Sequence, residues 1–206
     1  MKRLYLLRHG QTEFNVKKLV QGRCDSPLTD LGRKQAGMAA AWLKDHGVVP
    51  DKVVSSPLGR AMNTASLVAY ELLGPDAAVE PCEGIIERSY GTFEEGPHDA
   101  LPTDVWDPGE DLISFGGEGS HALQERMVGT LTNLMGAKGI ETLLAVSHGS
   151  ASRQFIKAAA PEGFELPTKL PNCAIMIFDF DDAREEDDTL QCKFTLQQIV
   201  DPQQSH

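Results

Sequence analysis

Two histidines in this chain directly follow short apolar runs, and each is followed by a glycine. His9 lies between Arg8 and Gly10, and His148 precedes Gly149. A neutral imidazole is a competent nucleophile toward phosphorus, and a guanidinium binds a phosphate through paired, charge-assisted hydrogen bonds. A glycine beside each histidine lets the backbone and a phosphate approach closely. These residue types together predict chemistry on a phosphate group.

Glu87 is the candidate for acid–base chemistry in the same site. A glutamate can protonate a leaving oxygen and then, as a base, activate water. Glutamates also commonly form surface ion pairs, and the sequence leaves both interpretations open. A different hypothesis makes His9, His148 and Glu87 the ligands of a metal ion. Arg8 argues against that hypothesis, because a divalent metal repels a neighbouring cation.

The elements that must position these residues alternate between strands and helices. Compact apolar runs predict strands at 3–7, 52–55, 78–82, 142–146, 174–180 and 192–199. Helical spacing predicts helices near 30–46, 57–73, 123–134 and 150–159. The second of these has Ser56 as a candidate N-cap and Pro57 at its first position. Alternating strands and helices predict an α/β sandwich with a mostly parallel sheet. Such sheets bind ligands at the carboxyl ends of their strands, so we expect His9, His148 and Arg60 to share one crevice.

We expect a single domain over residues 1–206 with an irregular lid insertion around 89–119. The lid stretch is rich in glycine, proline and acidic residues and has no clear period. The acidic stretch 179–188 is interpreted as a solvated loop. The other histidines are interpreted as surface residues: His46, His98, His121 and His206. The cysteines, none of them in a CxxC pair, are interpreted as buried, reduced thiols: Cys24, Cys82, Cys173 and Cys192.

The net charge limits the kinds of partner that the protein can have. Nineteen Lys and Arg against thirty Asp and Glu give a charge of −11, which disfavours sequence-independent binding to nucleic acid or to an anionic membrane. The apolar run at the N-terminus is too short for a signal peptide, and no stretch is long enough to cross a bilayer. We therefore expect a cytoplasmic protein in which a local cluster of positive groups holds any bound anion.

Several motifs, in order along the chain, resemble those of the histidine phosphatase superfamily, which includes the cofactor-dependent phosphoglycerate mutases. They cover most of the chain: LRHGQT at 7–12 with Asn15, Gln21-Gly22, DSPLT at 25–29 with Gly32, SSPLGRA at 55–61 with Thr64-Ala65, Glu87-Arg88 with Tyr90-Gly91, Glu95-Gly96, GGE at 116–118, VSHG at 146–149 and LPNC at 170–173. One of these blocks would be a weak signal, whereas so many in order are specific. The resemblance implies a phosphoglycerate mutase-like fold, which is a three-layer α/β/α sandwich.

The resemblance also implies a role for individual residues. His9 matches the nucleophile that becomes phosphohistidine, and Glu87 matches the proton donor. The contacts to the phosphoryl group match Arg8, Arg60, His148 and, as an auxiliary contact, Asn15. The remaining substrate-binding positions are Gln21, Gly22, Tyr90 and Gly149. The superfamily needs no metal, so the resemblance implies a metal-independent enzyme without a cofactor.

The acceptor of the phosphoryl group decides between two activities: water in a phosphatase, a second alcohol in a mutase. A mutase must hold the carboxylate of phosphoglycerate, which requires positive charge near the lid. From 89 to 125 the chain has no Lys or Arg, but it has these acidic residues: Glu94, Glu95, Asp99, Asp104, Asp107, Glu110, Asp111, Glu118 and Glu125. An acidic lid would repel a second anionic group, and Glu95-Gly96 resembles the phosphatase branch.

We therefore predict a metal-independent phosphatase that acts on a small phosphorylated metabolite with a neutral or cationic leaving group. The alternative is a cofactor-dependent phosphoglycerate mutase, in which Arg23 or Arg88 binds the carboxylate. More distant alternatives are a non-catalytic phosphate- or protein-binding relative and an enzyme that acts on phosphoproteins. The sequence leaves the oligomeric state open, a homodimer included.

Overall fold

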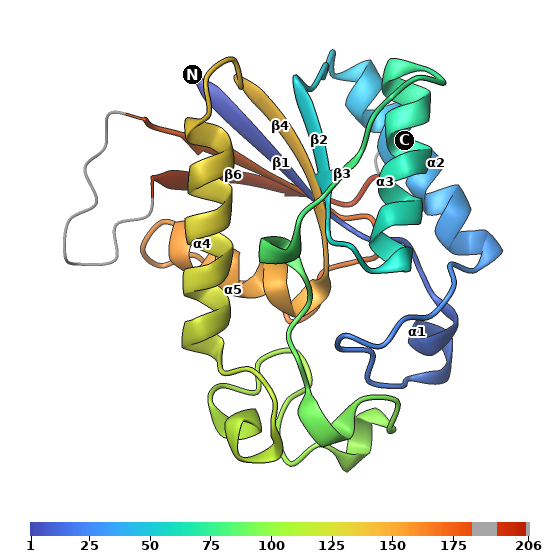
Figure 1. Cartoon of the computed structure of the whole chain (residues 1–206), viewed down its shortest axis with the longest axis vertical. Helices are drawn as coiled ribbons and strands as arrows, with labels where there is room; N and C mark the ends of the chain where they lie inside the picture. The colour runs from blue at the N-terminus through green and yellow to red at the C-terminus, as the bar shows by residue number, and fades with distance from the viewer. Residues whose placement is uncertain (183–192, 205–206) are drawn as a thin grey trace.

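A six-stranded sheet forms the centre of the computed structural model, which describes residues 1–182 and 193–204 (Figure 1). The strands are β1 (Lys2–Arg8), β2 (Lys52–Ser55), β3 (Glu80–Pro81), β4 (Thr142–Ser147), β5 (Ile175–Phe180) and β6 (Phe194–Val200). Their spatial order is β3-β2-β4-β1-β5-β6. Strands β1 to β4 pair in parallel, whereas β5 is antiparallel to β1 and β6 is antiparallel to β5. The prediction of a mostly parallel sheet is confirmed.

Helices cover both faces of this sheet, so the fold is the predicted three-layer α/β/α sandwich. The helices are α1 (Glu13–Lys17), α2 (Asp30–Asp45), α3 (Gly59–Leu73), α4 (Ser120–Gly136) and α5 (Gly149–Ala159). One buried apolar cluster joins α2 and α3 to the sheet face that presents Tyr5, Leu7, Leu144 and Val146. A second joins α4 and α5 to the face that presents Leu4, Leu6, Leu143 and Ala145. Because side chains alternate along a strand, the two central strands are apolar on both faces.

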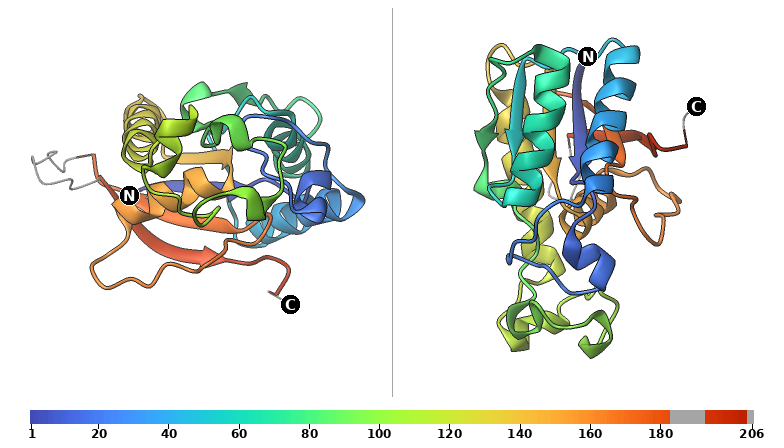
Figure 2. Two further views of the ribbon diagram at one scale, coloured as in Figure 1. Left: turned by 90° about the horizontal axis from the view of Figure 1, so that it is seen from below. Right: turned by 90° about the vertical axis from the view of Figure 1, so that its right-hand side faces the viewer.

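The segment 89–119 lies beyond the carboxyl ends of the parallel strands (Figures 1 and 2). It contains three short 3-10 helices, Gly91–Phe93, His98–Ala100 and Asp111–Phe115. Its Tyr90, Leu101 and Leu112 form a small buried cluster with Val20. The segment is thus packed rather than irregular. Single helical turns are too short to produce a period that sequence reasoning could detect.

Helix α3 begins two residues later than predicted and is capped by a distant residue. Its N-cap residue makes no side-chain hydrogen bond, and Ser56, the predicted N-cap, instead contacts Nε2 of His148 through its Oγ at 2.7 Å. The N–H groups of Gly59 and Arg60 donate to the carboxylate of Asp25 at 2.6 and 3.2 Å. A carboxylate from another segment therefore satisfies the free N–H groups that a local cap would otherwise bind.

Smaller differences concern the ends of elements. The predicted strand 78–82 is reduced to the two residues of β3, and the predicted helix 123–134 extends over all of α4. The acidic loop predicted at 179–188 starts later, because Asp179 belongs to β5 and pairs with Arg3 at 3.0 Å. Residues 183–188 of that stretch lie outside the described residues. No helix of the described residues is long and apolar enough to span a membrane.

The remaining histidines and the cysteines mostly lie as predicted. His46 and His121 are exposed, whereas His98 is half-buried, and its interpretation as a surface residue was wrong. Cys173 is buried, and Cys24 and Cys82 are half-buried; all three are free thiols. His206 and Cys192 lie outside the described residues.

Candidate active site

The carboxyl ends of β1 and β4 place the two predicted histidines side by side. The strands pair in register up to Arg8 and Ser147, and the N–H of His9 donates to the carbonyl of Ser147 at 3.0 Å. The ring centroids of His9 and His148 are 5.1 Å apart, with an angle of 61° between the rings. Parallel pairing of the strands is therefore what brings the two imidazoles together.

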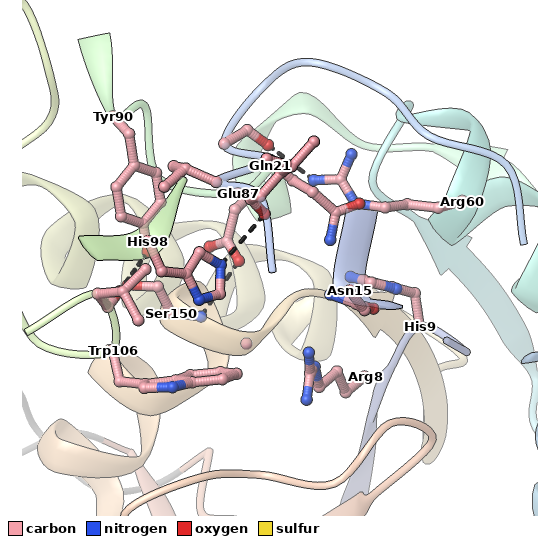
Figure 3. Close-up of a pocket in the computed structure, with 15 residues that line it drawn as sticks. Arg8, His9, Asn15, Gln21, Arg60, Glu87, Tyr90, His98, Trp106 and Ser150 are labelled. Atoms are coloured by element: carbon pink, nitrogen blue, oxygen red, sulfur yellow. Dashed lines mark hydrogen bonds between the residues drawn. The ribbon is translucent and has the colours of Figure 1, made fainter. Parts of the chain in front are cut away.

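A pocket opens beside His9, and Figure 3 shows the side chains that line it. All but one of the predicted site residues are among them: Arg8, His9, Asn15, Gln21, Gly22, Arg60, Glu87, Tyr90 and Gly149. His148 is fully buried next to His9 and is not a lining residue. The cavity volume is about 50 Å³, and a single water needs roughly 10–15 Å³ on this measure. The pocket therefore has room for a group of about the size of a phosphate.

The imidazole of His9 is held in one tautomer. Its Nδ1 lies 2.7 Å from the carbonyl oxygen of Gly10, which can only accept, so Nδ1 donates and Nε2 keeps its lone pair. Burial lowers the pKa of His9 well below 6.5, and the neighbouring charges of Arg60 and Arg8 lower it further. The ring is therefore neutral at pH 7, with its lone pair on Nε2.

The loop that carries His9 is fixed by close backbone contacts. A Cβ on Gly10 would lie 2.4 Å from the carbonyl oxygen of Gly32 in α2, so no side chain fits at position 10. The N–H of Gly10 donates to Oγ1 of Thr64 in α3 at 3.1 Å. Both helices on this face of the sheet thus hold the loop in place.

Arg8 and Arg60 bring two buried guanidinium groups to the pocket, with 3% and 1% of their surface exposed. Arg60 donates to the carbonyls of Cys24 and Gly22, both at 2.7 Å, and Arg8 donates to the carbonyl of Leu170. Burial lowers the pKa of Arg8 to about 10, which leaves it charged at neutral pH. These contacts to the main chain fix the direction of each guanidinium.

Three buried nitrogen atoms around the pocket have no hydrogen-bond partner within the described residues. They are Nε of Arg8, Nε of Arg60 and Nδ1 of His148. Buried polar atoms are nearly always paired in folded proteins, and a buried unpaired donor costs about 1–3 kcal/mol. A tetrahedral anion offers the several acceptor oxygens that such a group of donors needs.

Glu87 is almost fully buried, so its interpretation as a surface ion pair was wrong. One carboxylate oxygen accepts from the N–H of Arg88 and of Ala151, both at 2.8 Å, and the other accepts from the N–H of Ser150 at 3.2 Å. The last two N–H groups belong to the first turn of α5, where free donors and the helix dipole favour a negative group. The start of α5 thus holds Glu87 at the wall of the pocket.

Asn15 and Gln21 are both anchored by Thr12. The N–H of Thr12 donates to Oδ1 of Asn15 at 3.1 Å, and its hydroxyl donates to Oε1 of Gln21 at 2.9 Å. Asn172 donates to the same oxygen of Asn15 at 3.2 Å. These bonds orient two amide side chains at the edge of the pocket.

The two arginines considered for carboxylate binding do not line the pocket. Arg88 is fully buried and donates to the hydroxyls of Ser150 and Ser120 at 2.9 and 2.8 Å, which ties together the starts of α4 and α5. Arg23 lies 3.6 Å from Glu118. Arg88 is therefore a structural residue, and its proposed role in binding a substrate carboxylate was wrong.

Among the acidic residues of the segment 89–119, Glu94 lies directly behind the pocket wall, where its carboxylate accepts from the N–H of Tyr90 at 3.0 Å. None of these acidic residues is a lining residue, and several are already paired: Asp107 with Lys157 at 2.5 Å, Glu118 with Arg126 at 2.7 Å. Repulsion by an acidic lid is consequently weaker than the sequence indicated. Glu87 is the one carboxylate among the residues that line the pocket.

Sequence reasoning missed the lining residues of the side opposite His9. These are Leu19, Val20, His98, Val105, Trp106 and Ser150. His98 contacts the carbonyl of Leu19 through Nε2 at 3.1 Å, and burial lowers its pKa. The indole of Trp106 lies 5.0 Å from the guanidinium carbon of Arg8. No periodic pattern marked these positions. His98 and Trp106, for example, come from single turns of the segment 89–119, which are too short to show a period.

Residues 1–182 and 193–204 contain no group of three His, Cys, Asp or Glu side chains that could hold a metal ion. Comparison with known proteins shows the family directly, because the family model of the histidine phosphatase superfamily (branch 1) matches residues 4–192. The chain belongs to this superfamily. Its fold and its pocket are thus those of a histidine phosphatase superfamily member.

Relatives within the superfamily include both phosphatases and mutases. A broad-specificity phosphatase of Saccharomyces cerevisiae is 32% identical over 158 residues, which are 75% of this chain and 69% of the relative. A probable phosphoglycerate mutase of Escherichia fergusonii is 30% identical over 193 residues, which are 89% and 87% of the two chains. A mutant phosphoserine phosphatase from Entamoeba histolytica, solved in complex with phosphoserine, is 26% identical, with a TM-score of 0.74 over 98% of both chains.

Proposed function

We propose that the protein is a phosphatase that hydrolyses small phosphomonoesters through a phosphohistidine at His9. One observation supports this proposal above the others. The neutral Nε2 of His9 lies in a pocket with two buried guanidinium groups whose Nε atoms are unpaired. A phosphate satisfies those donors and presents phosphorus to the nucleophile at the same time.

The reaction proceeds in two transfers of the phosphoryl group. In the first, Nε2 of His9 forms a bond to phosphorus while the bond to the leaving oxygen breaks, and protonated Glu87 donates a proton to that oxygen. In the second, Glu87 removes a proton from water, the water oxygen bonds to phosphorus, and the bond to Nε2 breaks. Arg8 and Arg60 stabilise the charge on the transferring oxygens in both steps.

The charges that line the pocket favour a phosphatase over a mutase. Arg8 and Arg60 are the Lys or Arg residues among the lining residues, and both are committed to the phosphate side next to His9. No Lys or Arg lines the opposite side; the ammonium of Lys169 lies outside the lining, 5.9 Å from the ring of Trp106. This distribution supports a leaving group that is neutral or cationic. A mutase stays the second candidate, because the relative from Escherichia fergusonii carries that name.

A panel assay tests the proposal. The purified protein is assayed for phosphate release from a set of phosphomonoesters, and in parallel for mutase activity with 3-phosphoglycerate, with and without EDTA. We expect phosphate release that EDTA does not change. A preference for bisphosphorylated sugars or acids would contradict the assignment of a neutral or cationic leaving group.

Substitution of His9 tests the intermediate. We expect His9→Ala to lower phosphate release by at least about 10⁴-fold, because the step that forms the covalent bond is lost. His121→Ala, at an exposed histidine outside the pocket, is the matched control and should keep full activity. Wild-type protein quenched during turnover should carry acid-labile, base-stable phosphate, and His9→Ala should carry none. Turnover that persists without His9, or no turnover of any substrate, would refute the proposed function.

A further inference from the structure

The pocket has two chemically different sides. The guanidinium groups and His9 form one side, and Leu19, Val20, Val105 and two aromatic rings form the other. Figure 3 shows Tyr90 and Trp106 across the pocket from His9 and Arg60. In-line transfer puts the leaving oxygen opposite the attacking nitrogen. The leaving group must therefore extend toward the apolar and aromatic side.

Trp106 lies between two residues that are anchored by hydrogen bonds. Immediately before it, the carbonyl of Val105 accepts from the hydroxyl of Tyr90 at 2.7 Å. Immediately after it, the carboxylate of Asp107 accepts from Gln154 at 3.0 Å and from Lys157 at 2.5 Å, both in α5. Anchors on both sides fix the main chain at Trp106, although it belongs to a segment of short turns.

The ring of Trp106 packs directly on the first residue of α5. A Cβ on Gly149 would lie 2.6 Å from Cζ3 of the indole, so glycine at this position makes room for the ring. The ring also lies against Arg8, whose guanidinium carbon is 5.0 Å from the ring centroid. The indole thus lies next to the phosphate site without occupying it.

We propose that Trp106 determines substrate specificity by packing against an aromatic or flat apolar leaving group of the phosphomonoester. This rests on the proposed phosphatase function and names its substrate class. Aromatic pairs contribute free energy beyond the area that they bury, and the guanidinium and the ring stabilise each other through a cation–π contact. Lys169, whose ammonium lies 5.9 Å from the ring, offers the rival chemistry, which is attraction of an anionic leaving group.

Two substrates with the same phosphate and different leaving groups test the proposal: phenyl phosphate and glycerol 3-phosphate. For each substrate the kcat/KM of a variant is divided by that of the wild type, so that the intrinsic reactivities of the two esters cancel. We expect Trp106→Ala to lower the ratio roughly tenfold for phenyl phosphate and less than about twofold for glycerol 3-phosphate. Trp106→Phe should retain most of the activity toward phenyl phosphate, which shows that an aromatic ring at this position is what matters.

Trp42→Phe is the matched control, because Trp42 lies in α2 and stacks on His46 at 3.7 Å, outside the pocket. This variant should leave both ratios near one. Equal losses on both substrates for Trp106→Ala would mean that the ring serves the phosphate site alone and would overturn the proposal. Unchanged ratios for Trp106→Ala would overturn it too. So would a wild-type preference for 3-phosphoglycerate over phenyl phosphate that a Lys169→Met substitution abolishes.

A binding measurement separates this proposal from the proposed function. The chain has two tryptophans, so a His9→Ala, Trp42→Phe variant has Trp106 as its sole tryptophan, which is excited selectively at wavelengths that tyrosine does not absorb. Phenyl phosphate should change the fluorescence of that variant at a lower concentration than glycerol 3-phosphate does. Equal concentrations for the two esters would refute the role of Trp106, whether or not the wild type turns over. Failure of the phosphatase proposal shows separately, as wild-type protein that releases no phosphate.

Discussion

At the scale of single residues, the surroundings of His9 keep its imidazole neutral, with the lone pair on Nε2. The carbonyl of Gly10 fixes the proton on Nδ1, and burial together with two guanidinium groups keeps the ring neutral. The same guanidinium groups bind the substrate in our proposal. In that proposal the two positive charges attract the phosphate and, at the same time, suppress protonation of the nitrogen that attacks it.

This arrangement predicts the acidic side of the pH profile. The pKa of His9 in the free enzyme is lowered from 6.5, and kcat/KM reports ionisations of the free enzyme. The nucleophile therefore stays neutral as the pH falls through 6.5 and is lost only at lower pH. We correct kcat/KM for ionisation of the phosphate ester near pH 6. The corrected value at pH 6.5 should then equal the value at neutral pH. A half-maximal point at or above 6.5 would contradict this prediction.

Most residues of the phosphate side could be predicted from the sequence, whereas those of the leaving-group side could not. His9 and His148 follow the predicted strands 3–7 and 142–146, and parallel strands align their carboxyl ends, so residue order implied that the two imidazoles lie close together. The family resemblance, and not residue order, identified Asn15 and Gln21. His98 and Trp106 come from single turns with no period. Only the packing of the segment 89–119 against the strand ends brings them to the pocket, and no local pattern encodes that packing.

At the scale of elements, Asp25 in the loop before α2 orients Arg60 at the start of α3. Asp25 accepts from the N–H groups of Gly59 and Arg60 and lies 3.4 Å from the guanidinium of Arg60. One carboxylate therefore caps the helix and orients the side chain of its second residue. Sequence reasoning placed the cap locally, at Ser56, because a cap that comes from 34 residues earlier leaves no local signal.

We predict that Asp25 is a positioning residue for Arg60. Asp25→Ala should raise KM several-fold and change kcat less, because a misaligned guanidinium weakens phosphate binding, and should destabilise the protein by about 1 kcal/mol through the lost cap. Asp25→Asn keeps an acceptor oxygen and should recover most of the affinity. Steady-state kinetics and urea unfolding measure the two effects.

Asp51 provides the matched control for that experiment. It is an exposed aspartate that accepts from the N–H groups of Glu141 and Thr142, both at 2.8 Å, at the opposite ends of the strands. Asp51→Ala should lower stability and leave KM unchanged. An unchanged KM in Asp25→Ala would mean that Asp25 acts on stability alone, which would refute a positioning role.

At the scale of the whole molecule, positive charge is concentrated inside a protein of net charge −11. Arg8, Arg60 and Arg88 are buried, while the acidic residues of the segment 89–119 do not line the pocket. The two buried imidazoles add nothing to this positive charge at neutral pH, because burial lowers the pKa of both His9 and His148. Because the two histidines are neutral in the folded protein and titrate in the unfolded chain, the free energy of unfolding depends on pH.

The sign of this linkage gives a prediction for stability. In the unfolded chain both histidines take up protons below about pH 6.5, whereas in the folded protein they do so only at lower pH. The unfolded state therefore binds more protons in that range, and stability falls as the pH falls. We expect each histidine to contribute a loss of about 1.4 kcal/mol between pH 7.5 and 5.5, since one pKa unit corresponds to 1.36 kcal/mol.

Urea unfolding at the two pH values measures this loss. A His9→Gln, His148→Gln variant should lose clearly less stability on acidification than the wild type, because it lacks the two groups that titrate. A His46→Gln, His121→Gln variant, changed at two exposed positions, should follow the wild type. Equal pH dependence in all three proteins would contradict the burial argument.

The contact between Gly10 and Gly32 has a consequence for how this enzyme could diversify. Because backbone meets backbone there, neither glycine can take a larger side chain without moving the loop that carries His9. The segment 89–119, by contrast, contributes side chains to the pocket wall, those of Tyr90, His98, Val105 and Trp106. We therefore expect substrate preference to diverge through these four positions while the position of His9 stays fixed.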